Sequence, residues 1–293
     1  MRLSQEKNRL KRWSVAASIS VAVILITIKF FAWYLTGSIS LLSSLTDSFL
    51  DFGASLINMI AIYHAAQPAD EEHRFGHGKI EALAALLQSV IVIGSSCFLI
   101  RESIERFFNP QPLQHTLAGI WVMVASIILL LALVAFQRYV IRRTKSLTII
   151  ADSTHYKGDL LLNIGVLISI SSYHLFGWSS IDAVFGAIIS TYIIYTAYDI
   201  SKSAVNILLD REIPAEDRTQ ILDIIESHPK VKGCTDFRTR SSGAGEFIYA
   251  NVLFPATMSI QESSKVIKQI EESILKVYPD SEILLHSTPH KKD

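Results

Sequence analysis

The sequence predicts a chain in two parts, an all-α transmembrane domain of six helices followed by a small α/β domain with the element order αββαβ. Half of the 293 residues are hydrophobic and only 18% are charged, against roughly a quarter in ordinary soluble domains. The apolar residues lie mainly between Trp13 and Ile200, and the last 80 or so residues resemble a soluble domain. We therefore expect a six-helix transmembrane domain over residues 1–210 and a small α/β domain over residues 211–293.

Six segments are long enough to cross a bilayer, which takes roughly 20 apolar residues in a helix. They are expected at about residues 14–35, 39–66, 80–100, 117–136, 147–173 and 181–201. Lys and Arg are concentrated in the N-terminal segment and in the loops after the second and fourth segments. Because cytoplasmic loops carry the excess of Lys and Arg, we expect both termini in the cytoplasm.

The C-terminal part alternates between helical and strand patterns. Helices are expected at 214–228 and 258–277, and strands at 231–240, 246–254 and 281–286. The first two strands are joined by the Gly/Ser turn SSGAG. A domain of about 75 residues buries a limited core, so we expect it to gain stability by dimerising.

Charged residues inside the apolar segments are the first sign of function. The second segment contains Asp47 and Asp51, and the fifth contains His155 and Asp159. Each pair is spaced i,i+4, which places both side chains on one helix face. Facing each other, the pairs would offer three carboxylates and one imidazole, a set suited to zinc and acceptable to ferrous iron, cadmium or cobalt. An isolated Asp is as readily a cap or pore-lining residue, but two equally spaced pairs favour a metal site.

Two other charged residues in these segments receive structural interpretations. Asp152 is expected near the inner end of the fifth helix, where an acid near the surface interacts favourably with the helix dipole. Lys29 can extend its amine to the interface or pair locally, and we assign it no function.

The loop after the second segment, PADEEHRFGHGKIEA, holds a second candidate set. Asp70, His73 and His77 can converge in a short loop, and Gly76 and Gly78 allow a tight turn. One carboxylate and two imidazoles make a three-ligand cytoplasmic metal site with a position left for water. The alternative is a solvated polar loop without a ligand.

These motifs resemble the cation diffusion facilitator family, and most closely its bacterial branch of zinc and ferrous-iron efflux pumps. The resemblance is carried by TDSFLD, by DxxHRFGHGKxE and by HYKGD, and the segments LLDREIP, TDFRTRSSG and ILLHSTP extend it over nearly the whole chain. It implies a homodimer in the bacterial inner membrane that exports metal. The residues that it implies are the transport site Asp47, Asp51, His155 and Asp159, the loop site Asp70, His73 and His77, and a charge pair, Lys79 with Asp210, that locks the dimer near the membrane surface.

One part of the resemblance fails in the tail. In this branch the cytoplasmic domain carries a histidine-rich two-metal site, and the matching positions here are Thr235, Asn251, Ser264, His286 and Thr288. Only His286 offers a good zinc ligand, because hydroxyls and amides bind zinc poorly. We expect this third site to be absent or very weak, with His286 a structural or surface residue.

Together the residues and the resemblance predict a proton-coupled antiporter that moves zinc, ferrous iron or cadmium out of the cytoplasm. His155 is the expected proton carrier, since the unperturbed pKa of imidazole is roughly 6.5. The expected partners are a second copy of the chain, the lipid bilayer, divalent metal ions and protons, without an organic cofactor. A zero net charge gives no reason to expect nucleic acid.

Two alternatives stay open at this point. The same fold could export manganese or iron with little zinc transport, or the chain could be a membrane-anchored metal sensor or scaffold. An anchor alone needs no carboxylates in lipid, which argues against the sensor. An enzyme is not expected, because the sequence offers neither a Gly-rich phosphate loop nor a defensible nucleophile–base pair.

Overall fold

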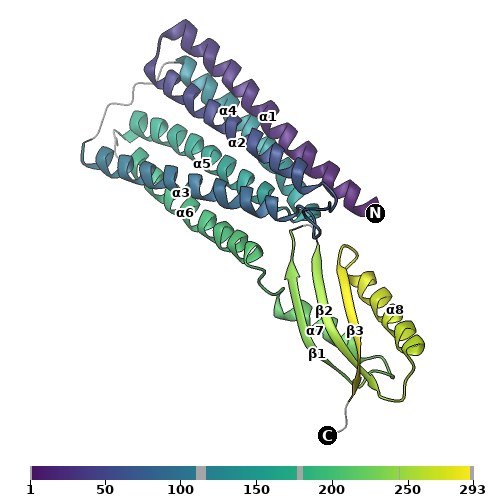
Figure 1. Cartoon of the computed structure of the whole chain (residues 1–293). Helices are drawn as coiled ribbons and strands as arrows, with labels where there is room; N and C mark the ends of the chain where they lie inside the picture. The colour runs from purple at the N-terminus through teal and green to yellow at the C-terminus, as the bar shows by residue number, and fades with distance from the viewer. Residues whose placement is uncertain (1, 110–116, 177–180, 244, 291–293) are drawn as a thin grey trace. The chain divides into compact units, whose positions relative to one another are not determined.

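The structure, a computed structural model, describes residues 2–109, 117–176, 181–243 and 245–290. It separates into two compact units, which Figure 1 shows and which are described here one at a time. The first contains residues 1–67 and 80–205, and the second contains residues 68–79 and 206–293. The loop that carries the second candidate metal set therefore groups with the C-terminal domain.

The first unit is built from six long helices, α1 to α6, within the described part of the chain. Their bounds are Arg2–Thr36 for α1, Ile39–Ala65 for α2, Lys79–Phe108 for α3, Leu117–Thr144 for α4, Leu147–Phe176 for α5 and Ile181–Leu208 for α6. Helix α1 begins about three turns before the expected span. Its added turns are rich in Lys, Arg, Glu and Leu, which are good helix formers.

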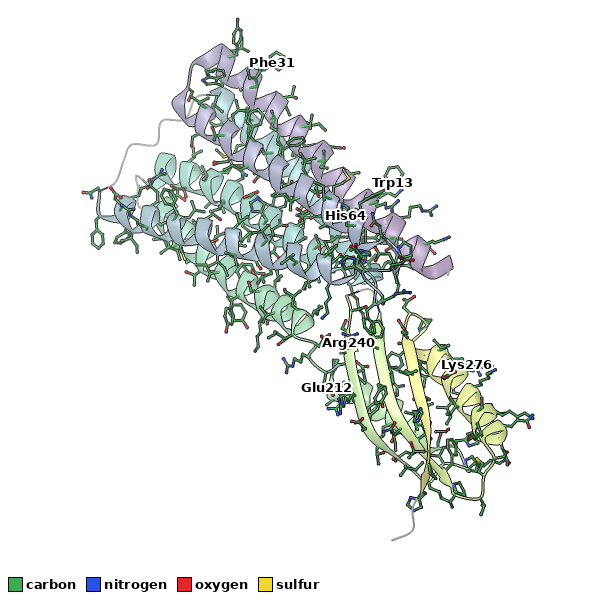
Figure 2. All side chains as sticks on the ribbon, in the orientation of Figure 1. Trp13, Phe31, His64, Glu212, Arg240 and Lys276 are labelled. Atoms are coloured by element: carbon green, nitrogen blue, oxygen red, sulfur yellow. The ribbon has the colours of Figure 1, made fainter. Side chains whose placement is uncertain are left out.

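Five of these helices, α1, α2, α3, α4 and α6, are long and apolar enough to cross a membrane. Helix α5 is not among the five, and its first half carries Asp152, Lys157 and Asp159. Large apolar side chains cover the outside of the unit, as Trp13 and Phe31 on α1 show (Figure 2). An outer surface of this kind suits a hydrocarbon environment, where apolar side chains need no burial in protein.

Helix α1 packs along α2 and α4, and α4 packs along α5 (Figure 1). Two apolar clusters hold this arrangement, one around Leu25, Leu133 and Tyr156, and one around Val15 and Val140. Helices α3 and α6 meet through a third apolar cluster of Val92, Ile193 and Ala197. Their contact also includes a hydrogen bond from the Ser201 hydroxyl to the Ser89 hydroxyl, 2.8 Å long.

A buried ion pair connects the start of α1 to the start of α3. The Lys11 ammonium contacts the Glu81 carboxylate, and both side chains are 7% exposed. The Ser146 hydroxyl, just before α5, donates to the same carboxylate. The Thr148 hydroxyl donates to the Glu81 carbonyl at 2.9 Å. This end of the unit therefore closes around one carboxylate whose oxygens are all paired, as a buried charge requires.

The second unit places two helices on one face of a three-stranded sheet (Figure 1). The elements are α7 (Ala215–Glu226), β1 (Gly233–Ser241), β2 (Glu246–Pro255), α8 (Ile260–Val277) and β3 (Glu282–His290). Strand β2 is central, antiparallel to β1 and parallel to β3. The register of β1 shifts between Thr235 and Arg238, where Asp236 has a positive φ of 52°, as in a β-bulge.

Alternation along β2 decides which face of the sheet becomes the core. Ile248, Ala250, Val252 and Phe254 are at most 2% exposed and lie under the helices. The helices contribute fully buried isoleucines to the same core, namely Ile221 and Ile225 from α7 and Ile270 and Ile274 from α8. The residues between them on β2 point to the opposite face, since strand side chains alternate.

Residues 68–79 are held to the sheet of the second unit by aromatic and charged contacts. The Phe75 ring meets the Phe247 ring edge-on, with centroids 5.5 Å apart. The Arg240 guanidinium lies 4.7 Å from both ring centroids, a cation–π arrangement. Gly243 approaches Gly78 so closely that an added Cβ would lie 2.8 Å from the Gly78 carbonyl oxygen, so this contact requires glycine.

Candidate metal centre

The membrane cluster, which we define as Asp51, His155 and Asp159, joins α2 to α5. The His155 Nε2 lies 2.7 Å from an Asp51 carboxylate oxygen and 3.6 Å from an Asp159 oxygen. The last two residues are one turn apart on α5, so the helix itself sets their spacing. The Asp159 carbonyl accepts a hydrogen bond from the Asn163 amide at 2.8 Å.

The geometry of the membrane cluster suits a small cation. One ligand atom from each of the three side chains lies within 4.8 Å of the others. Zinc bonds to nitrogen and oxygen ligands are about 2.0–2.2 Å long, so tetrahedral ligand atoms lie about 3.3–3.6 Å apart. Small side-chain rotations would bring the three atoms to that spacing. Two carboxylates and one imidazole are donors that zinc and ferrous iron accept.

Asp47 lies outside this group of three. It is exposed, and it precedes Asp51 by one turn on α2. The structure thus brings together three of the four residues expected at this site. Between the two acids, Ser48 is buried and accepts a hydrogen bond from the Lys29 ammonium at 2.7 Å. The same ammonium donates to the Ser44 carbonyl at 3.0 Å, so Lys29 pairs with α2, which is one of the two alternatives left open for it.

The structure corrects the interpretation of Asp152. This residue is 2% exposed and does not lie near a surface. Its carboxylate accepts hydrogen bonds from four side chains on four helices, which we call the Asp152 network: Ser18 on α1, Asn58 on α2, Gln88 on α3 and Gln137 on α4. The expectation was wrong because helix position was judged without the neighbouring helices. The sequence did contain a signal for this burial, namely four residues with amide or hydroxyl side chains in otherwise apolar helices.

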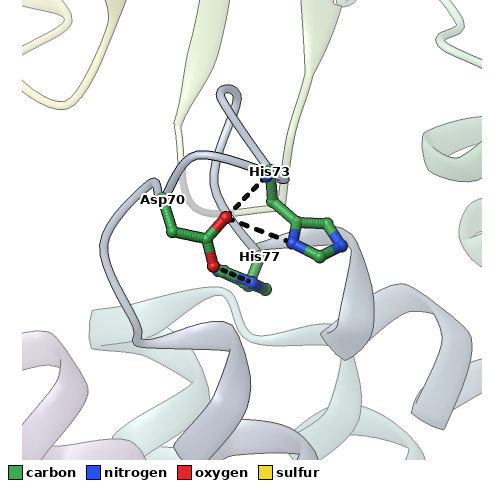
Figure 3. A group of neighbouring side chains, drawn as sticks. All are labelled: Asp70, His73 and His77. Atoms are coloured by element: carbon green, nitrogen blue, oxygen red, sulfur yellow. Dashed lines mark hydrogen bonds and ion pairs between the residues drawn. The ribbon is translucent and has the colours of Figure 1, made fainter.

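The loop cluster, Asp70, His73 and His77, comes together within eight residues (Figure 3). One Asp70 carboxylate oxygen lies 3.3 Å from His73 Nδ1, and the other lies 3.3 Å from His77 Nε2. The two imidazole rings have centroids 4.5 Å apart. Gly76 makes this turn feasible with a φ of +76°, and its amide donates to the His73 carbonyl at 2.9 Å. The three residues predicted from the loop sequence are therefore neighbours.

Backbone hydrogen bonds prepare Asp70 as an anion. The His73 amide donates to its carboxylate at 2.6 Å, and the Glu72 amide donates at 3.0 Å. The first of these bonds is the main reason why the pKa of Asp70 lies below its usual range. His77 is the most buried member of the cluster, and its Nδ1 has no hydrogen-bond partner among the described residues. The loop cluster can offer one oxygen and two nitrogens to a cation.

Lys79 and Asp210 form an ion pair within one chain. The Lys79 ammonium lies 2.9 Å from the Asp210 carboxylate, and the Arg240 guanidinium lies 3.0 Å from the same oxygen. Partial burial raises the pKa of Asp210, but hydrogen bonds and charges from both cations outweigh it and hold the pKa below its usual range. The pair therefore fastens residue 79 to the start of the C-terminal domain.

Three of the five tail positions expected to lack metal lie in one row across the sheet, whereas Ser264 is on α8 and Thr288 pairs with Leu253. Thr235 pairs with Asn251, and Asn251 pairs with His286. His286 is exposed, and among the described residues it belongs to neither of the two groups of metal-binding side chains. The neighbouring Cys234 has its pKa raised to about 11 by burial, so at neutral pH it is a protonated thiol and a poor metal ligand.

A unit of long apolar helices, with a cluster of carboxylates and histidine between two of them, is the arrangement expected of a membrane transporter of cations. The comparisons with known proteins agree. Residues 15–209 match the family model of the cation efflux transmembrane domain, and residues 213–290 match that of the cation efflux protein cytoplasmic domain. The chain belongs to the cation efflux family.

Similar proteins cover nearly the whole chain. The cation-efflux pump FieF of Escherichia fergusonii is 39% identical over 287 residues, which cover 98% of this chain and 95% of that protein. FieF of Escherichia coli K12 has the same identity and coverage. Two solved structures of the zinc transporter CzrB, one in its zinc form, match 27% and 29% of this chain and 99% of their own, with TM-scores of 0.26 and 0.27 and identities of 16% and 17%.

Proposed function

We propose that this protein exports a divalent transition metal, zinc or ferrous iron, from the cytoplasm in exchange for protons. The observation that carries the proposal is the membrane cluster, because two carboxylates and an imidazole between apolar helices have few other uses. The similar FieF proteins are described as cation-efflux pumps, which supports the direction of transport. The metal ion is the cargo in this proposal.

The donor set supports a transition metal over other cations. Calcium favours six to eight oxygen ligands, and magnesium retains several waters, whereas the membrane cluster offers two carboxylates and one nitrogen. Asp47 lies one turn from Asp51 on α2. It could supply a fourth ligand if α2 turns slightly about its axis in the loaded state. Cadmium accepts similar ligands and is a further candidate cargo.

Proton exchange follows from the chemistry of the same three groups. A metal ion binds neutral imidazole and ionised carboxylates, so metal entry releases any protons that the cluster holds. His155 lies within 2.7 Å of Asp51 and 3.6 Å of Asp159. It is therefore placed to hold a proton between two acids when the metal has left. Protons that enter from the far side would reload the cluster and complete the cycle.

The remaining parts of the proposal concern assembly and placement. All six helices, α5 included, would span the bacterial inner membrane, with both termini in the cytoplasm. Two copies would associate through their αββαβ domains, and the Lys79–Asp210 pair would hold each chain in the register needed for the dimer. The loop cluster would bind metal on the cytoplasmic side, whereas the degenerate row at His286 would bind metal weakly or not at all.

Reconstituted vesicles test the proposal directly. An inward proton gradient should drive zinc export, followed with a zinc-sensitive dye and a pH-sensitive dye in the same vesicles. His155→Ala should abolish metal-dependent proton movement, because no imidazole remains between the acids. His64→Ala removes an exposed imidazole at the end of α2 and should leave flux unchanged. Intact proton-coupled flux in His155→Ala would contradict the assignment, and parallel runs with iron, cadmium and manganese would identify the cargo.

A further inference from the structure

The Asp152 network is a buried set of hydrogen-bonded polar side chains inside the helical unit. The proposed transport cycle does not use it. Its five members are at most 5% exposed, and each comes from a different helix, α1 to α5. A charged group at such depth is costly unless it is paired and hydrogen-bonded. Packing alone therefore does not explain why a carboxylate is buried at this position.

The hydrogen bonds around Asp152 favour a carboxylate over a carboxylic acid. One oxygen accepts from the Ser18 hydroxyl at 2.7 Å and from the Gln137 amide at 2.8 Å. The other accepts from the Asn58 amide at 3.0 Å and, at a longer 3.4 Å, from the Gln88 amide. The three amides donate to the carboxylate as they are oriented, and the Ser18 hydroxyl, which also lies 3.3 Å from the Ser14 carbonyl, can donate or accept. A carboxylate uses all four contacts as an acceptor, whereas a protonated acid would need the Ser18 hydroxyl as its acceptor.

A second hydrogen bond fixes the orientation of one donor. The Asn58 amide nitrogen also donates to the Gln88 side-chain oxygen at 2.6 Å. With the Gln88 amide oriented as it is, reversing the Asn58 amide would set two oxygens against each other there, and would also turn an oxygen toward Asp152. The donors of the network are therefore arranged to stabilise a negative charge on Asp152.

This fixed charge lies close to the membrane cluster. Asp152 precedes His155 by three residues on α5, a rise of about 4.5 Å along the helix on the same face. The same two helices carry an intermediate contact, the Tyr156 hydroxyl with the Ser55 hydroxyl, 3.0 Å apart. The polar contacts between α2 and α5 thus run from the membrane cluster through Ser55 and Tyr156 to Asn58 and Asp152.

We propose that Asp152 is a positioning residue that strengthens cation binding at the membrane cluster by holding a negative charge beside it. It touches neither the metal ion nor its ligands. A unit charge within about 10 Å in a partly buried setting changes ion binding by at least about tenfold. This inference rests on the proposed function for the identity of the cation, zinc.

Asp152→Asn tests the charge, because asparagine has nearly the same shape. Zinc is titrated into the full-length protein in nanodiscs, and the zinc site that disappears in His155→Ala marks the membrane cluster. Asp152→Asn should weaken that site by at least about tenfold. Ser18→Ala and Gln137→Leu, made one at a time, each remove one donor and leave three to stabilise the carboxylate. Each should lower the melting temperature but change zinc affinity by less than about threefold.

Exchanging the carboxylate and the amide of one contact separates the effect of the charge on zinc binding from its effect on folding. Asn58→Asp combined with Asp152→Asn returns one carboxylate and one amide to the same contact, and the Gln88 amide can reverse to meet the new acid. This double variant should bind zinc within about threefold of the wild type. A folded double variant that binds ten times more weakly, or one that does not fold, would overturn the inference. The double variant also decides the case if Asp152→Asn alone fails to fold.

Two outcomes distinguish this inference from the proposed function. If Asp152→Asn binds zinc as tightly as the wild type but melts at a lower temperature, the network has only a structural role. That result overturns this inference and leaves the proposed function intact. A wild-type protein that binds zinc at His155 but does not carry it across vesicles contradicts the proposed function alone. Absence of any zinc site that depends on His155 overturns both.

Discussion

The membrane cluster and the loop cluster use the same two kinds of ligand but hold them in opposite ways. The membrane cluster joins residues 104 positions apart, Asp51 and His155, and two long helices fix their positions. The loop cluster draws all three ligands from eight residues, and Asp70 and His73 are more than half exposed. A helix-borne site changes only when helices move, whereas a loop site adapts and exchanges ligands with water.

The two clusters should therefore differ in how much transport depends on them. A cluster between helices can be coupled to alternating access, because a change in helix packing alters the ligand geometry. A loop cluster that groups with the C-terminal domain can capture or sense metal without lying on the transport path.

Removing one charge from the membrane cluster should have the largest effect. Asp51→Asn keeps the shape of the side chain but replaces an anionic ligand by a poor neutral one. We expect zinc flux in vesicles to fall at least about 100-fold, since a charged ligand at such a site contributes several kcal/mol. Initial rates at saturating and limiting zinc measure it.

Asp47→Asn is the matched comparison on the same helix. Because Asp47 is exposed and lies outside the group of three, we expect a smaller loss, below about tenfold. Equal losses in both variants would mean that Asp47 is a full ligand during transport, and that α2 rotates between the described arrangement and the loaded one.

The loop cluster should contribute to metal binding more than to flux. Replacing His73 and His77 together by Ala removes both nitrogen ligands and leaves a lone exposed carboxylate. We expect each chain to lose one bound zinc in equilibrium dialysis, with transport reduced less than about tenfold. His286→Ala is the control, and should change neither quantity because His286 belongs to neither group of potential metal ligands among the described residues. An unchanged zinc count in the double variant would show that the loop holds no metal.

The two clusters also differ in how far the sequence could predict them. The loop cluster follows from spacing within one short segment and two glycines, and Asp70, His73 and His77 do meet. The membrane cluster required a guess that two distant helices face each other, and three of its four residues meet. The position of Asp47 relative to the site was harder to predict. Its i,i+4 spacing from Asp51 places both side chains on one face of the helix, but it does not say which turn of that face the partner helix contacts.

The fold was predictable to a similar extent. The helical N-terminal domain and the small sheet-containing domain follow from hydrophobicity and period, and both are found. The environment of Asp152 was not predictable, since its four partners come from four different helices. Burial of a polar residue depends on all its neighbours, whereas sequence periodicity describes one helix at a time.

The attachment of the loop to the C-terminal domain should respond weakly to pH. The pKa of Asp210 is raised by partial burial but held below its usual range by Lys79 and Arg240. A carboxylate with a depressed folded-state pKa stabilises the fold above its unfolded pKa, near 3.9. That stabilisation is lost as pH falls through the lower folded value. The side chains are 28–42% exposed, so the effect is below about 1 kcal/mol.

Hydrogen exchange of residues 72–78 in the full-length protein, corrected for intrinsic rates, measures this attachment. Wild-type protection should hold from pH 7 to about 4 and decline below that. Asp210→Asn should already be less protected at pH 7 and should change less with acid. Glu262→Gln breaks another surface pair, with Lys230, and should leave the loop unaffected. If Asp210→Asn follows the wild-type profile, the loop is held by the Phe75–Arg240–Phe247 stack and not by the ion pair.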